Sequence, residues 1–292
     1  MPDTPAPANN AAKSYAPGDI DALVRATAAA KAAAARARFA GRPPDAQDTR
    51  AVYIESCAAI AAAFAPLGYK FSKSGPHFTA KSRDKQFTYR VSFQSSHNNI
   101  PGQHIKLLVH VGITSPVVKQ WEAALWTRHG LGEEHRRYQR DGNIIGTQLG
   151  YIVPPPEKPA WLEWELAHAH TRATAIADIT DRITRHALPW FAHCEDIPRL
   201  IEHIIQTGSY PNDYLAHFPS EFLLCFATKE QTARALAAYL KKLPPAARGN
   251  LYKDLATARA ESPLQVNRMG FFGCSTRYLL TEGVEFPDAK SL

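Results

Sequence analysis

Long apolar runs are missing from this chain of 292 residues, although 45% of them are hydrophobic. No stretch reaches the roughly 20 uncharged apolar residues that a membrane-spanning helix needs, which excludes a transmembrane protein. Residues 1–6 lack a basic region followed by an apolar one, so no signal peptide is predicted. The four cysteines are far apart and none has CxxC spacing. This excludes a disulfide scaffold and a structural zinc site, and it favours a reducing cytoplasm.

Catalytic sequence motifs are missing as well. The chain has no HExxH, GxSxG, P-loop or GxGxxG pattern, which leaves the common metalloprotease, hydrolase, NTPase and dinucleotide-binding classes without support. Twelve histidines are present. However, His168 and His170 would point about 200° apart on a helix, and His104 and His110 would lie roughly 20 Å apart along a strand. The sequence therefore predicts no metal site, no cofactor and no set of catalytic residues.

One cysteine has neighbours of the kind that activate a nucleophile. His193, Cys194 and Glu195 precede a predicted helix, whose N-terminus favours a thiolate. Adjacent residues seldom form a catalytic pair, so an uncharacterised hydrolase remains only the third of three functional hypotheses.

Positive charge is in excess and is unevenly distributed. The chain has 34 Lys and Arg against 27 Asp and Glu, a formal net charge of +7. Residues 1–150 carry 19 basic and 11 acidic residues, a net charge of +8, whereas the remainder is near neutral. Between residues 69 and 110 only Asp84 opposes seven basic residues. Such a region attracts acidic partners, although lysine at a strand edge also prevents edge-to-edge pairing.

Two segments show the alternation of a sheet with one apolar face. In residues 86–95 and 103–113 apolar and polar side chains alternate, and strand side chains point to opposite faces with period two. The predicted core face consists of Phe87, Val91, Phe93, Ile105, Leu107, Val109 and Val111. The opposite face carries the candidate binding residues Arg90, Gln94, His104, Lys106 and His110, with Ser95 at the end of the first strand.

The predicted fold class is α+β. We expect a one-sided antiparallel sheet of four or five strands between residues 69 and 153, packed with helices at 50–66 and 117–128. An all-helical C-terminal region should follow, beginning with one long helix over 162–188 that Pro189 ends. The expected units are a disordered tail (1–18), an Ala-rich helix (19–48), the sheet domain (49–153) and the helical region (154–292), which could pack on the sheet as one domain.

The order of several short motifs resembles that of a known bacterial family. Residues 67–71 read Leu-Gly-Tyr-Lys-Phe, and strands ending Val-Ser-Phe-Gln-Ser (91–95) and Val-His-Val-Gly-Ile (109–113) follow, then Ala-Leu-Pro-Trp-Phe (187–191). This order is similar to domain-of-unknown-function family 4304, with its pattern GFkk…F…vnfQkS…inlG…lPff, over about residues 50–210. Where the family commonly has Gln-Lys-Ser, this chain has Gln94, Ser95 and Ser96. The resemblance implies no activity.

The favoured functional hypothesis is a non-catalytic cytoplasmic binding protein. A basic polar sheet face suits a partner protein with an acidic surface, and by analogy the chain could neutralise a bacterial toxin as an immunity protein does. Nucleic-acid binding is the alternative, but it requires aromatic and basic residues on the same exposed face. Alternation instead places Phe87, Tyr89 and Phe93 opposite Arg90. No membrane partner is expected.

Overall fold

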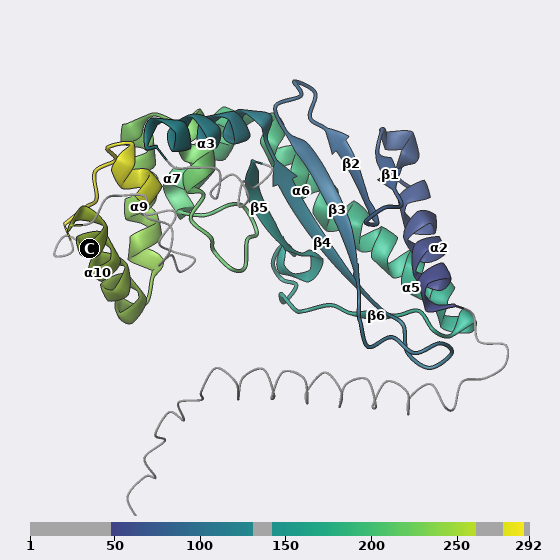
Figure 1. Ribbon diagram of the computed structural model, residues 1–292. Coiled ribbons are helices and arrows are strands. Elements are labelled where there is room, and N and C mark those ends of the chain that lie inside the picture. The colour runs from purple at the N-terminus through teal and green to yellow at the C-terminus, as the bar shows by residue number, and fades with distance from the viewer. Residues whose placement is uncertain (1–47, 131–141, 261–276, 289–292) are drawn as a thin grey trace, which may run out of the picture.

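The computed structural model describes residues 48–130, 142–260 and 277–288, and an antiparallel sheet lies at its centre (Figure 1). Six strands form this sheet in the order β1-β2-β3-β4-β5, with β6 paired to the first residues of β4. Their bounds are β1 Lys70–Ser72, β2 His77–Lys81, β3 Thr88–Ser95, β4 Lys106–Thr114, β5 Asn143–Gln148 and β6 Trp164–Glu165. The α+β class and the antiparallel sheet are thus confirmed, with one strand more than the four or five expected.

Helices cover one face of this sheet (Figure 1). These are α2 (Thr49–Ala62) and a long helical stretch made of α5 (Ala169–Arg182), the π-helical turn η3 (Ile183–Ala187) and α6 (Leu188–Ala192). Asp48 caps α2 by accepting a hydrogen bond from the backbone N–H of Ala51. The short 3-10 helix η1 (Ala65–Leu67) then leads into β1.

Buried and accessible side chains alternate along β3 and β4 as the sequence predicted. All seven residues predicted for the core face are buried, with 0–7% of each exposed. Arg90, Gln94 and His110 are more accessible and lie at the intervening positions. Strand β3 pairs with β4 in one unbroken register, from Thr88 with Thr114 to Ser95 with Leu107. A one-residue slip would exchange the two faces, so the predicted register is confirmed.

The C-terminal helices lie beside the sheet, and most of them share its core. They are α7 (Ile197–Thr207), α8 (Ser220–Phe226), α9 (Lys229–Lys242) and α10 (Pro245–Ala260), and α3 (Pro116–Arg128) lies among them. Phe87 next to β3 packs on Phe222 and Phe226 of α8, with ring centroids 6.4 and 5.4 Å apart. The main hydrophobic cluster therefore runs from α2 through the sheet to α7, α8 and Ala235 in the middle of α9. Within the described residues no helix is long and apolar enough to cross a membrane.

The prediction of one long helix over residues 162–188 was wrong at both ends. Its first residues instead include strand β6, and Leu166 extends the sheet pairing by donating its backbone N–H to Ile105 O at 2.8 Å. Helix α5 begins only at Ala169. At the other end the helix continues past Pro189, which occupies the first turn of α6, where its missing N–H is tolerated. The expected tail and Ala-rich helix, apart from Asp48, lie outside the described residues.

Candidate functional site: the open polar face of the sheet

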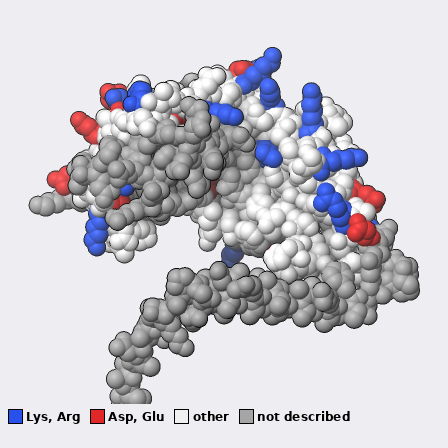
Figure 2. Space-filling model, viewed as in Figure 1, with Lys and Arg blue, Asp and Glu red and all other residues white. Residues whose placement is uncertain are grey.

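The face of the sheet opposite α2, α5 and α6 is lined by polar side chains, and we call it the polar face. Its central row crosses five strands, because Lys70 pairs with Thr79, Thr79 with Arg90, Arg90 with Gly112, and Gly112 with Gly146. In strands β1–β5 the polar-face positions include no Asp or Glu. Lys and Arg side chains gather over β1, β2 and β3 in Figure 2. The described polar face is thus positive on its β1–β3 half.

A hollow lies on the β3–β5 half of the polar face. It has a volume of about 330 Å³ and is lined by Arg90, Ser92, His110, Val111, Gly112, Thr114, Asn143, Gly146 and Thr147. Gly112 and Gly146 face each other across β4 and β5, so no side chain fills the space above this pair. A Cβ at Gly112 would already lie 3.3 Å from Ile145 O. We call this pocket the glycine hollow.

Arg90 supplies the positive charge of the glycine hollow. Its Nε atom is buried and has no hydrogen-bond partner in the structure. A buried donor without a partner costs free energy, more so when the group is charged. A guanidinium presents its N–H groups in a planar fork that matches a carboxylate. An anionic group that entered the hollow would balance the charge of the Arg90 guanidinium.

His110 forms the wall of the glycine hollow next to Arg90. Its Nε2 lies 3.0 Å from Gln94 Oε1, and because a carbonyl oxygen only accepts, the ring nitrogen donates. Burial lowers the pKa of His110 below its ordinary value. His110 is therefore a neutral ring at pH 7, and the charge of the hollow comes from Arg90.

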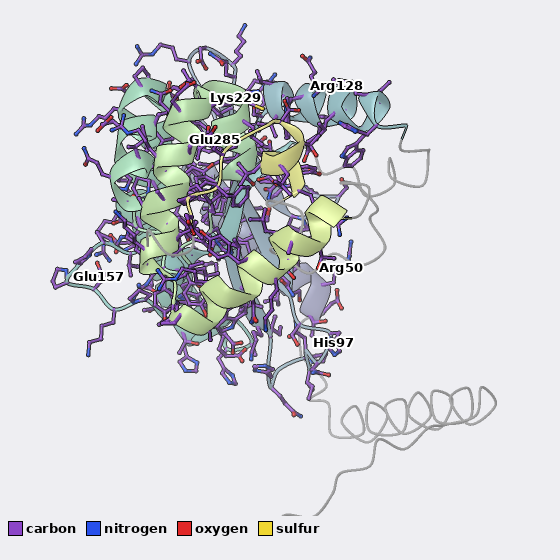
Figure 3. The ribbon with its side chains drawn as sticks, turned by 90° about the vertical axis from the view of Figure 1, so that its left-hand side faces the viewer. Arg50, His97, Arg128, Glu157, Lys229 and Glu285 are labelled. Carbon is purple, nitrogen blue, oxygen red and sulfur yellow. The ribbon has the colours of Figure 1, made fainter. Side chains whose placement is uncertain are left out.

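The remaining three predicted residues have partners within the chain, and Ser95 was wrongly assigned, because it pairs with Leu107 and so occupies a core-face position at the end of β3. Lys106 forms an ion pair with Glu163, and His104 forms one with Glu165. Ser95 Oγ accepts a hydrogen bond from Asn99 Nδ2 at 2.7 Å. In Figure 3, His97 of the neighbouring turn and Glu157 lie toward one end of the molecule, opposite Arg128 and Lys229. The structure thus brings Arg90, Gln94 and His110 together, whereas His104 pairs with Glu165 of β6 and Lys106 forms an exposed ion pair with Glu163 just before that strand.

Glu165 connects β6 to β4. Its Oε1 accepts hydrogen bonds from the backbone N–H groups of Ile105 (2.6 Å) and Ala167 (2.8 Å). Burial opposes its ionisation, but these two N–H groups and His104 outweigh burial and lower the pKa of Glu165.

We expect Glu165→Gln to destabilise the protein at neutral pH more than at acid pH. A carboxyl whose pKa is lowered by folding contributes stability above its unfolded pKa of ~4.3, and this stability disappears as the pH falls through the lower folded pKa. Urea unfolding of both proteins at pH ~7 and ~3 measures the difference. Glu163→Gln, at an exposed ion pair, is the control and should have little effect. An equal loss from Glu165→Gln at both pH values would contradict this role of the charge.

The cysteine considered as a nucleophile is not accessible. Cys194 is 2% exposed, and burial raises the pKa of its thiol to about 12. Its neighbour Glu195 accepts a hydrogen bond from the Tyr89 hydroxyl at 2.7 Å. Among the residues that the structure describes, no group of three His, Cys, Asp or Glu side chains could hold a metal ion. The prediction that His168 and His170 point apart on a helix was wrong: His168 lies before the first residue of α5, and the two rings stack with centroids 5.8 Å apart.

Two features of the polar face were missed by the sequence reasoning. One is the pairing of Gly112 with Gly146, although glycine within a strand indicates a close approach or an open space. The other is a set of aromatic rings from outside the strands: Trp161 lies against His110, with ring centroids 6.1 Å apart. The predicted core aromatics do lie on the helix-covered face, where Tyr89 stacks on Phe191 at 5.0 Å.

Comparison with protein-family models gives a match, over residues 60–193, to the domain of unknown function DUF4304. The chain carries a DUF4304 domain. This domain runs from the last residues of α2 to the end of α6 and contains every residue of the glycine hollow. Helices α7–α10 lie beyond the matched residues, although α7 and α8 share the DUF4304 core. No curated protein and no solved structure matches the chain.

Proposed function

We propose that this protein is a non-catalytic cytoplasmic binding protein whose glycine hollow takes an acidic side chain of a partner protein. The version we favour is an immunity-type protein that neutralises a bacterial toxin. The single observation that carries the binding proposal is Arg90, a cation in a hollow whose described lining has no acidic residue. A carboxylate would pair with the guanidinium and balance its charge.

The chemistry of the described lining favours binding over catalysis. Besides Arg90, its one titratable side chain is His110, which donates to Gln94 and not to Ser92 or Thr114. A hydroxyl nucleophile requires a base within hydrogen-bonding distance. The uncharacterised-hydrolase hypothesis therefore receives no support from this lining.

We expect N-acetyl-aspartate amide, a single acidic side chain with blocked ends, to bind the hollow weakly. In an NMR titration of the full chain it should shift the resonances of Arg90 Nε–H and of the Gly112 and Gly146 amides, because the carboxylate lies among them. Arg90→Gln should abolish these shifts. Lys70→Gln, which removes an exposed charge from the same row of the sheet, is the control and should leave them.

Two results would contradict the proposal. Shifts that survive Arg90→Gln would place the anion elsewhere. A single-stranded oligonucleotide that binds tightly, and whose affinity falls steeply as salt rises, would favour the nucleic-acid alternative. The immunity-type version has its own test, which is co-expression with the product of the adjacent reading frame. The chain should restore growth that this product arrests, and Arg90→Glu should not.

A further inference from the structure

Three aromatic rings outside the sheet form a continuous exposed strip. Trp161 is 51% exposed and Tyr214 is 60% exposed, and Tyr151 lies between them. The ring centroids of Trp161 and Tyr151 are 6.1 Å apart, and those of Tyr151 and Tyr214 are 5.4 Å apart. Leu215, 48% exposed, follows Tyr214. We call Trp161, Tyr151, Tyr214 and Leu215 the aromatic strip.

The aromatic strip begins where the glycine hollow ends. His110 lines the hollow and also packs edge-on against Trp161, with ring planes inclined by 68°. From His110 to Tyr214, consecutive rings are 6.1, 6.1 and 5.4 Å apart. This path corresponds to at most about five residues of extended chain at ~3.3 Å per residue. One short peptide segment could therefore contact both the hollow and the strip.

The loop that presents Tyr214 is held firmly in place. The buried carboxylate of Asp213 accepts hydrogen bonds from the backbone N–H groups of Leu215 (3.1 Å) and His217 (2.8 Å). Tyr214 itself donates its N–H to Tyr151 O at 3.2 Å. Asn212 and Ala216, on either side, have positive φ angles of 53° and 48°, a backbone conformation that costs free energy in residues other than glycine. The fold thus maintains a strained loop that keeps two large apolar side chains in solvent.

We propose that the aromatic strip docks the apolar part of an extended partner-protein segment whose carboxylate enters the glycine hollow. This inference rests on the proposed function and specifies the partner: an acidic residue and, within about five residues, a large apolar one. Rigid Trp and Tyr rings in the open are typical of the residues that dominate binding energy in protein interfaces.

Charge at the strip favours a protein over a nucleic acid. The Nε1–H of Trp161 donates to Glu163 Oε1 at 3.1 Å, so a carboxylate stands at the edge of this ring. Glu163 is in turn paired with Lys106, which leaves that cation already neutralised. A polyanion that stacked its bases along the strip would bring its phosphates toward Glu163. A peptide with one acidic residue would bring its only negative charge to Arg90.

The test is selection of a displayed library of random heptapeptides on the full chain. Enriched peptides should share an acidic residue and, up to five positions away, a large apolar residue. The dissociation constants of synthetic copies should rise about tenfold or more with Trp161→Ala and with Tyr214→Ala. Trp161→Phe and Tyr214→Phe should retain most of the affinity. Leu67→Ala, at an apolar residue that is 59% exposed on η1, is the matched control and should change nothing.

The outcomes separate this inference from the proposed function. If Arg90→Gln weakens the peptides but neither strip variant does, the hollow binds acids and the docking role of the strip is wrong. If the strip variants weaken them and Arg90→Gln does not, the strip binds without the hollow and the combined site is wrong. If no peptide is enriched, or if an oligothymidylate binds and loses affinity with Trp161→Ala, the inference is overturned.

Discussion

A chain that ends after His193 is expected not to reach the native fold, although it contains all the residues that match DUF4304. The hydrophobic core does not end where the match ends. Leu200, Ile204, Phe222 and Leu223, from α7 and α8, are 0–2% exposed and belong to the same cluster as the sheet. Removing them would expose the apolar surface around Phe87. Burial of apolar surface is the main force that stabilises a fold.

Side-chain hydrogen bonds would be lost with the same truncation. Trp190 Nε1–H donates to Pro211 O at 2.9 Å, so the buried indole would lose its partner. Circular dichroism and thermal unfolding of the truncated and full chains measure the effect. The full chain should melt cooperatively, and the truncated chain should show no cooperative transition. A sharp melt and a dispersed amide spectrum for the truncated chain would show that residues 194–292 are dispensable.

Replacement of Phe78 by alanine is expected to lower the free energy of unfolding by about 3–5 kcal/mol. Phe78 of β2 is completely buried and lies at the centre of an aromatic cluster that joins α2 to the sheet. Its ring centroid is 5.1 Å from that of Phe64, 5.4 Å from that of Tyr69 and 5.9 Å from that of Phe93. The substitution removes three ring contacts and leaves a cavity that rigid strands cannot close.

Chemical denaturation at one pH measures the loss caused by Phe78→Ala. Tyr214→Ala removes a ring of similar size from an exposed position, and its cost should stay within about 0.5 kcal/mol. A loss below ~1 kcal/mol for Phe78→Ala would mean that the cluster repacks around the missing ring. The expected difference between the two losses of unfolding free energy comes from the burial of Phe78 and the exposure of Tyr214.

The parts of the fold that alternation governs could be predicted from the sequence. A strand residue can point to either face of the sheet. From Phe87, just before β3, to Phe93 within it, apolar and polar residues alternate strictly, so the pattern assigns every side chain to one face without conflict. The same pattern placed Arg90, Gln94 and His110 on one surface, where the structure has them. The helices expected at 50–66 and 117–128 were also located to within a few residues, as α2 and α3.

The parts that depend on distant contacts could not be predicted. Strand β6 has two residues and no periodicity of its own, and it exists because Lys106 pairs with Glu165 and Leu107 with Trp164. The ion pairs of His104 and Lys106 join residues about sixty positions apart. The glycine hollow likewise requires the register of β4 with β5, which places Gly112 beside Gly146. The position of either glycine in the sequence does not reveal which residue of the neighbouring strand it pairs with.

The alternation of buried and polar positions in β3 and β4 also bears on how this protein can evolve. Val91, Phe93, Val109 and Val111 are committed to the core, where most substitutions are costly. Ser92, Gln94 and His110, interleaved with them, contribute little to the core, and surface substitutions of this kind usually change stability by less than about 0.5 kcal/mol. The codons of Ser92, Gln94 and His110 can therefore vary almost independently of folding. Lineages could alter the chemistry of the polar face repeatedly while inheriting the same scaffold.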